Sequence, residues 1–158
     1  MIFVTVGMHF QGFERLIKKM DEIASKIDEE VIMQVGSTSY KPKNAYYFDF
    51  KVFEQISELI KKARLTVCHG GAGTFIVAFE LGTPVIAVPR LKKYNESVND
   101  HQLELVNALA KAGKIIAVLD LDKLENVINN PFIKLSKKIK KNNNLVEALR
   151  DYINGLSH

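Results

Sequence analysis

The run His-Gly-Gly-Ala-Gly-Thr at residues 69–74 has the residue types and spacing of a phosphate-binding turn. The apolar residues Leu65–Cys68 before it are typical of a buried strand, and a helical apolar pattern after it ends at Gly82-Thr83-Pro84. A strand, a glycine turn and a helix N-terminus present unpaired N–H groups and a positive dipole end to an anion. Glycines suit this role because a Cβ would hold the phosphate away from the backbone. The run matches neither GxxxxGK[ST] nor GxGxxG, so those nucleotide classes lose support, and a turn without a ligand is the alternative.

Two other segments carry side chains that could bind or react. His9 follows the first predicted strand and suits proton transfer or phosphate binding, unless it is only a loop residue. Asn99-Asp100-His101-Gln102 opens a predicted helix, where Asn99 or Asp100 could serve only as the N-cap. In a site, Asp100, His101 and Gln102 could bind the hydroxyls of a sugar, because sugar recognition needs several fixed polar partners.

Composition sets the outer limits of the interpretation. The 158 residues favour one domain, and a net charge of +4 with a pI near 9.1 suits anionic ligands without requiring nucleic acid. The single cysteine, Cys68, allows no internal disulfide and fits a reducing cytoplasm. We expect no membrane span and no signal peptide, and no metal, because Asp120-Leu121-Asp122 is more typical of a helix cap than of a metal-binding pair.

The elements that must position these residues alternate between strand and helix. Apolar runs without polar alternation predict strands at Ile2–Val6, Val31–Val35, Ala45–Phe50, Leu65–Cys68, Pro84–Val88 and Ile115–Leu119. This alternation predicts an α/β fold, a Rossmann-like parallel sheet with helices on both faces. Ligands bind such sheets at the carboxyl ends of the strands. The loops expected there are Gly7–Gly12, Gly36–Tyr40, His69–Thr74 and Pro89–Gln102.

The last part of the chain has a different character, so we divide the chain into a domain at 1–130 and a basic, amphipathic helical segment at 131–158. Lysines crowd residues 134–141, and Leu145–Ile153 carries an apolar stripe at helical spacing, with Asn144 as an N-cap candidate. The plainer interpretation is a helix packed on its own domain. The alternative is a docking helix for another subunit or an acidic bilayer surface.

Taken together, these motifs are more specific than each is alone. Residues 69–74, Gly82–Pro84, Val88-Pro89-Arg90 with Glu96, and Asn99–Gln102 resemble the donor-binding domain of the peptidoglycan UDP-N-acetylglucosamine transferase superfamily. With Phe3–Gly7, His9 and Gln34–Ser37, the chain is similar to the small catalytic subunits of two-component glycosyltransferases. Those subunits act in exopolysaccharide, capsule and dolichol-linked glycan synthesis. The resemblance covers roughly residues 1–130.

The resemblance implies the C-terminal half of a GT-B glycosyltransferase, with the UDP-sugar donor at the strand ends. The diphosphate would lie on the glycine turn, the donor sugar near Gln102, and uracil against the backbone near Val52-Phe53. The donor-binding residues that it implies are Gly7, Phe53, His69, Gly70, Gly71, Ala72, Gly73, Thr74, Asp100 and Gln102. His9 and His101 are the candidate catalytic residues.

This chain departs from the family at two positions. Val77 stands where a glutamate usually binds the ribose hydroxyls, and Glu80, nearly on the same helical face, is a candidate substitute. Met8 stands where threonine is usual. These departures keep two alternatives open: a nucleotide-sugar-binding module without catalysis, and a purely structural subunit.

The resemblance also implies the reaction and its setting. An acceptor hydroxyl on a lipid-linked sugar would attack the anomeric carbon with inversion, and UDP would leave without help from a metal. A membrane-anchored partner subunit would complete the site and recruit this cytoplasmic chain to the inner face of the membrane.

Overall fold

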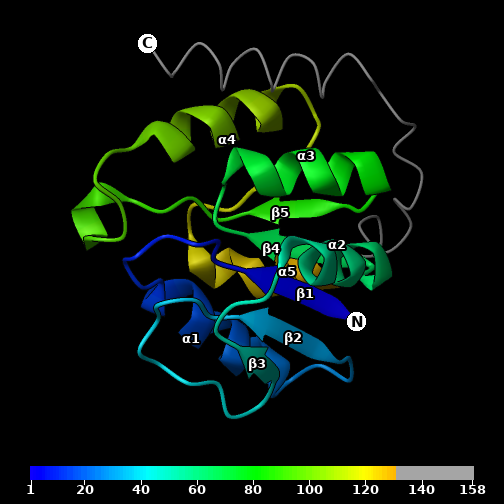
Figure 1. Cartoon of the computed structure of the whole chain (residues 1–158). Coiled ribbons are helices and arrows are strands. Elements are labelled where there is room, and N and C mark those ends of the chain that lie inside the picture. The colour runs from blue at the N-terminus through cyan, green and yellow to red at the C-terminus, as the bar shows by residue number, and fades with distance from the viewer. Residues whose placement is uncertain (131–158) are drawn as a thin grey trace.

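The computed structural model describes residues 1–130, which form a six-stranded, wholly parallel sheet with helices on both faces (Figure 1). Its strands are β1 (Ile2–Thr5), β2 (Val31–Gln34), β3 (Tyr46–Phe48), β4 (Leu65–Cys68), β5 (Val85–Ala87) and β6 (Ile116–Ala117). Their spatial order is β3-β2-β1-β4-β5-β6. The α/β class expected from the sequence is confirmed, whereas the segment 131–158 lies outside the described residues.

Five α-helices and two short 3-10 helices connect these strands within residues 1–130. They are α1 (Glu14–Ala24), α2 (Phe53–Lys62), α3 (Ala72–Leu81), α4 (His101–Lys111), α5 (Leu124–Asn129), η1 (Lys92–Tyr94) and η2 (Leu121–Lys123). The apolar residues of α1 and α5 pack on one face of the sheet, and those of α2, α3 and α4 pack on the other. No helix in this part of the chain is long and apolar enough to cross a membrane.

The strands read as continuous apolar runs because both of their faces are covered. In β1, Ile2 and Val4 join the core under α1, while Phe3 joins the core under α2 and α3. All three side chains are fully buried. Helix α3 is apolar around most of its surface and ends at Gly82, which adopts the left-handed conformation with φ +70° that glycine favours at a helix C-terminus.

The sequence placed the elements correctly but made several of them too long. The strand expected at Ala45–Phe50 spans only Tyr46–Phe48, and the one expected at Ile115–Leu119 spans Ile116–Ala117. Both are edge strands with one neighbour, so fewer of their residues pair. The C-cap of α4 is Ala112, and Gly113 follows it with φ +68°, the left-handed conformation that glycine favours just after a helix.

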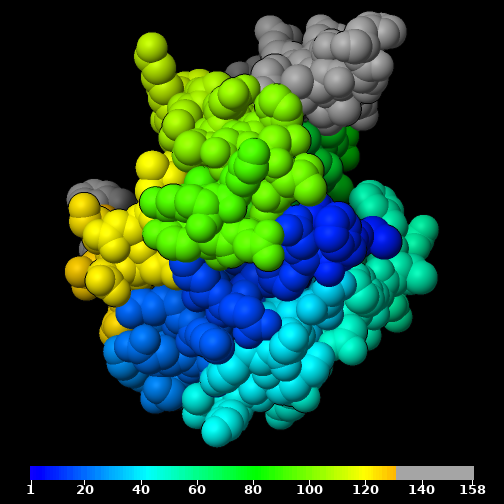
Figure 2. All heavy atoms as spheres, turned by 90° about the vertical axis from the view of Figure 1, so that its left-hand side faces the viewer, coloured from blue at the N-terminus to red at the C-terminus, as the bar shows by residue number. Residues whose placement is uncertain are grey.

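The strand order has a consequence for ligand binding. Strands β1 and β4 are neighbours, and the chain proceeds outward from them in opposite directions. Such a switch point separates the loops that follow the two strands and opens a crevice at their carboxyl ends. Figure 2 shows this edge of the sheet, with the blue loop after β1 between the green segment after β5 and the cyan segment after β2. His9 and the glycine turn at 69–74 therefore meet at the switch point.

A buried carboxylate ties one of these loops to α1. Asp21 is 2% exposed and accepts hydrogen bonds from the Tyr40 hydroxyl (2.6 Å) and from the backbone N–H groups of Lys43 (3.0 Å) and Asn44 (2.7 Å). Burial alone would raise the pKa of the Asp21 carboxyl, but these hydrogen bonds outweigh it, so the pKa lies below its ordinary value. The ionised carboxylate thus stabilises the path from β2 to β3.

We expect Asp21→Asn to lower the free energy of unfolding at pH 7 by roughly 1.5–3 kcal/mol, because the acceptor loses its charge. The folded pKa is depressed, so this contribution is complete above about pH 4 and is lost as the pH falls through the folded pKa. Urea titrations of both proteins between pH 7 and pH 2.5 should show the difference shrinking only in acid. Asp122→Asn, at a 94% exposed side chain, is the control. A difference independent of pH would contradict the assignment.

Candidate functional site

The ring of His69 fixes the geometry of the glycine turn. Its Cε1–Nε2 edge lies against both Gly7 and Gly71, and its Nδ1 is 3.3 Å from the carbonyl oxygen of Thr5. A Cβ on Gly7 would lie 2.6 Å from the ring, and one on Gly71 would lie 2.3 Å from Nε2, closer than real Cβ contacts come. The histidine ring therefore requires glycine at both positions, and Gly7 also has φ +71°. The donor contact that the resemblance implies for both residues stays a prediction.

The other two glycines of the turn differ from each other. Gly70 has φ +91°, and a Cβ there would lie 2.8 Å from Val106 Cγ2, so this residue lets β4 pass close to α4. Gly73 is exposed, and a Cβ there would meet nothing within 4 Å. Gly73 is thus the glycine of the turn with open space beside it, within the first helical turn of α3.

The N-terminus of α3 is suited to an anion. Its N-cap is Gly71, which has no side chain to cap the helix, and no acidic residue lies in its first turn. The N–H groups of Ala72, Gly73 and Thr74 therefore have no intrahelical acceptor, and the helix dipole adds a partial positive charge. These are the residues that the resemblance assigned to the diphosphate, and that role stays a prediction.

Arg90 joins the loops around this turn and was not among the predicted site residues. It is fully buried, and its guanidinium stacks on Phe13 with 4.9 Å from Cζ to the ring centroid. It donates hydrogen bonds of 2.8–3.1 Å to the carbonyl oxygens of Val6, Gln11, Gly12 and Glu96. Burial lowers the pKa of Arg90 to about 10, and the Glu96 carboxylate offsets part of this, so the cation persists at neutral pH. In the sequence, the sign of this role was a charged residue two positions after the predicted buried strand Pro84–Val88.

A second arginine binds the carboxylate of Glu96, the residue whose carbonyl oxygen accepts a hydrogen bond from Arg90. Arg15 of α1 binds Glu96 through two hydrogen bonds of 2.9 Å, and its Nη2 also reaches the Pro89 carbonyl at 3.1 Å. Glu96, which is 5% exposed, accepts a further bond from the Leu91 N–H. The segment after β5 is thereby fixed to α1, and Glu96 in the sequence motif has a structural explanation.

His9 occupies the loop between these groups. Its Nδ1 accepts a hydrogen bond of 3.1 Å from the backbone N–H of Gln11, and its ring stacks on Phe10 with a centroid distance of 4.6 Å. Burial and, to a smaller extent, the charge of Arg90 lower the pKa of His9. Burial and Arg90 likewise lower the pKa of His69, to about 4, and His9 contributes. Both imidazoles are neutral at pH 7.

The three polar residues that open α4 do not act alike. Gln102 lies beside the turn, with Oε1 3.4 Å from the Arg90 backbone N–H and Cβ near Gly70. Asp100 accepts a bond from the Lys92 N–H (2.9 Å) and so holds η1, and it is the N-cap without a capping bond from its side chain. His101 is exposed, and its Nδ1 lies 3.7 Å from Glu104. The structure thus brings Gln102 to the turn, while a catalytic role for His101 stays a prediction.

The remaining predicted residues lie around the same edge or on α3. Phe53 begins α2 and is 65% exposed, and Phe50 just before it lies near Gly36 in the loop after β2. Val77 is half-buried against the core under α3, whereas Glu80 is exposed on the same helix. The ribose-binding role of Glu80 in place of the usual glutamate stays a prediction.

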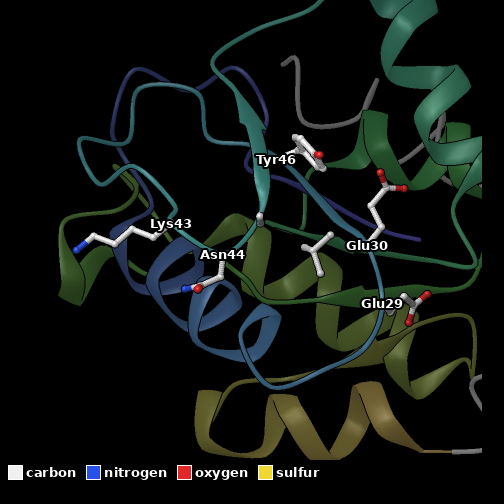
Figure 3. Close-up of a pocket in the computed structure, with 7 residues that line it drawn as sticks. Glu29, Glu30, Lys43, Asn44 and Tyr46 are labelled. Atoms are coloured by element: carbon white, nitrogen blue, oxygen red, sulfur yellow. The ribbon is translucent and has the colours of Figure 1, made fainter.

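Two surface cavities help to locate the site. One of about 320 Å³ lies at the carboxyl edge, between the loops after β1 and β2 and η1, and its walls include Gly12, Arg15 and Tyr94. A larger one of about 500 Å³ lies at the opposite edge, where Val31 and Tyr46 begin their strands (Figure 3). Parallel sheets bind ligands at the carboxyl ends of their strands, and the glycine turn with its uncapped helix N-terminus lies there, so we place the candidate site at that edge despite the smaller volume.

The chemistry available at this edge is anion binding. Unpaired N–H groups, a helix dipole and the buried Arg90 cation all favour a phosphate, and Gln102 adds an amide beside it. Among residues 1–130, no group of three or more His, Cys, Asp or Glu side chains is arranged to hold a metal ion. The expected independence from metals remains a prediction.

Fold and site together define the class: a doubly wound α/β domain with a glycine turn and an uncapped helix N-terminus at its switch point. The solved structures that it resembles share this fold. The glycosyltransferase of kitacinnamycin matches with a TM-score of 0.65 at 16% identity, over 95% of this chain and 39% of that one. MurG of Acinetobacter baumannii matches with a TM-score of 0.59 at 16% identity, over 94% of this chain and 49% of that one.

The chain belongs to the family of glycosyltransferase family 28 C-terminal domains, whose model matches residues 1–155. It is similar to the UDP-N-acetylglucosamine transferase subunit ALG13 of Homo sapiens, with 31% identity over 126 residues, which is 72% of this chain. The corresponding protein of Mus musculus is 27% identical over 124 residues. This chain spans about 10% of the length of both relatives. The family resemblance seen in the sequence is confirmed.

Proposed function

We propose that this chain is the donor-binding, catalytic subunit of an inverting UDP-sugar glycosyltransferase. The observation that carries the proposal is the glycine turn with open space beside Gly73, which lies at the switch point of the sheet. The chain that carries this turn belongs to a glycosyltransferase family. The similar human protein is a UDP-N-acetylglucosamine transferase subunit, which supports a UDP-sugar as the donor. The acceptor would be a lipid-linked sugar, bound with the help of a membrane-anchored partner subunit that recruits this chain to the cytoplasmic face.

The proposed reaction needs stabilisation of negative charge more than it needs covalent chemistry. The acceptor oxygen forms a bond to the anomeric carbon, and the bond from that carbon to the diphosphate breaks with its electron pair on the phosphate oxygen. The N–H groups at the start of α3 would bind this developing charge, and the buried Arg90 would add the field of a fixed positive charge. Such preorganised dipoles can stabilise a leaving diphosphate without a metal ion.

A nucleotide-sugar-binding module without catalysis is the second candidate. Val77 favours it, because a valine that packs against the core cannot accept hydrogen bonds from ribose hydroxyls. Tight binding of UDP together with absence of transfer, when the partner is present, would distinguish this module from the enzyme. Absence of UDP binding would instead favour a purely structural subunit.

Gly73→Asp tests the binding site directly. The new side chain enters open space and its charge suits the first turn of a helix, so the variant should fold. Its carboxylate would repel the diphosphate, and we expect UDP affinity to fall at least tenfold, which is about 1.4 kcal/mol or more. Isothermal calorimetry measures the affinity, and circular dichroism checks the fold.

Ala108→Asp is the matched control, because it places the same charge on an exposed position of α4, two turns beyond its start. It should leave UDP affinity within about twofold of the original protein, since exposed charges farther than a Debye length are screened. A folded Gly73→Asp variant with unchanged affinity would remove the turn from the site.

A further inference from the structure

We infer that His9 acts in the proposed transferase as a neutral hydrogen-bond donor through Nε2, and not as the general base. The inference rests on the proposed function and assigns one role among those that the sequence leaves open for this residue. Its ligand is an oxygen of the donor diphosphate. The argument starts from the one ring nitrogen whose partner the structure identifies.

The tautomer of His9 is set by its own loop. The backbone N–H of Gln11 points at Nδ1 over 3.1 Å, and a backbone amide can only donate. Nδ1 must therefore offer its lone pair, and the proton of the neutral ring lies on Nε2. A general base at Nε2 would need the opposite tautomer, with a proton on Nδ1 facing the Gln11 N–H.

The residue that imposes this tautomer is itself held from two sides. The Gln11 carbonyl oxygen accepts a 2.9 Å hydrogen bond from the buried Arg90, and its side-chain amide donates to the Asn95 carbonyl at 3.0 Å. Phe10 stacks on the imidazole. Because Gln11 is anchored to the segment after β5, the ring of His9 cannot exchange tautomers without disturbing bonds far along the chain.

Charge acts in the same direction as this geometry. A protonated His9 would set an N–H against the Gln11 N–H and place a second cation near Arg90. Burial and the Arg90 charge accordingly lower the pKa of His9. At neutral pH the ring is uncharged, and Nε2–H is its free polar group.

The position of His9 identifies the class of acceptor. Gly7, two residues earlier, and Gly71, the N-cap of α3, lie against the same Cε1–Nε2 edge of the His69 ring, and the His9 charge acts on the pKa of that ring. The loop that carries His9 thus lies beside the N-terminus of α3 at the switch point. A donor there would bind the diphosphate oxygen that receives the electron pair when the bond to the anomeric carbon breaks.

The proton of the acceptor hydroxyl must then go elsewhere. The tautomer of His69 leaves the lone pair on Nε2, because its Nδ1–H faces the Thr5 carbonyl, which can only accept. His69 is nevertheless unsuited as the base, because Nε2 lies against Gly7 and Gly71, the residue is only 8% exposed, and its pKa is about 4. We therefore assign the base to His101, the other predicted catalytic residue, or to a group of the partner subunit.

Three substitutions separate a donor from a base. The amide nitrogen of glutamine takes the place of Nε2, and that of asparagine takes the place of Nδ1. We expect His9→Gln to bind UDP within about threefold of the original protein, whereas His9→Asn and His9→Ala should bind about tenfold more weakly. Calorimetry gives the affinities, and circular dichroism confirms that each variant folds. Equal weakening in His9→Gln and His9→Ala, or no weakening in His9→Ala, would overturn the inference.

A second measurement determines the tautomer of His9 directly and needs no activity assay. Long-range proton–nitrogen correlation spectra of the full chain at pH 7.5 should show His9 with its proton on Nε2, both free and with UDP. A proton on Nδ1 would overturn the inference even if UDP binds at the turn. If the unsubstituted protein does not bind UDP at all, the proposed function fails together with the inference. The two failures can therefore be distinguished.

Discussion

Replacing Arg90 with methionine should lower the free energy of unfolding by roughly 3–5 kcal/mol, the range measured when a buried ionic partner is removed. The guanidinium is fully buried and donates to four carbonyl oxygens in two loops. Methionine fills similar space but leaves those acceptors without donors, and each orphaned buried acceptor is costly. The loops after β1 and β5 would separate, and UDP binding should be lost with them.

Urea denaturation with and without UDP measures both effects. Arg90→Lys keeps the charge but cannot reproduce the planar set of donors, so we expect its free energy of unfolding to lie between those of the original protein and Arg90→Met. Lys18→Met is the control: its side chain is 60% exposed and its pairing with Glu14 is 4.0 Å, so it should change stability by less than about 0.5 kcal/mol. An Arg90→Met protein as stable as the control would show that the four bonds do not hold the loops.

The sequence predicted the parts of this fold that depend on local patterns. Leu65–Cys68 is the strand β4 as expected, and the helix after it begins at Ala72 and ends before Gly82. Apolar periodicity and glycine placement encode these features within a few residues. Asp120 also caps η2 through the Asp122 N–H, as its spacing suggested.

Features that join distant segments were not predictable in the same way. Arg90 bonds to the Val6 carbonyl across 84 positions of sequence, and no local pattern specifies that contact. Gly7 and Gly71 are likewise explained by a shared neighbour, the ring of His69. The glycine motif suggested phosphate contact for Gly71, and the family resemblance implied donor contact for Gly7, because neither can distinguish room for a ligand from room for a side chain.

The Asp-His-Gln segment shows a further limit of reading motifs along the chain. Successive helical residues project about 100° apart, so neighbours in a motif cannot all face one ligand. Gln102 approaches the turn, while His101 faces solvent beside Glu104. Helical geometry could have separated these two residues before the structure was known, but choosing between them required the position of β5.

Transfer to a lipid-linked acceptor should require a partner subunit. Residues 1–130 form one sheet, whose carboxyl edge is open and carries an apolar rim: Met8 (82% exposed), Phe10 (74%), Phe53 (65%) and Val98 (61%). Exposed apolar residues grouped around a binding site are typical of a surface that another protein covers.

We therefore expect the purified chain to bind UDP but to show no measurable transfer, and the same chain with a membrane-anchored partner to turn over. The measurement is transfer of radiolabelled sugar to a lipid-linked acceptor. Met8→Ser combined with Phe10→Ser should reduce co-purification with the partner at least tenfold, because both apolar side chains would lose their burial. Leu119→Ser, at an exposed leucine after β6, should leave it unchanged. Transfer by the chain alone would show that the open edge already holds the acceptor and its base, whereas full partner binding by the double variant would place the interface elsewhere.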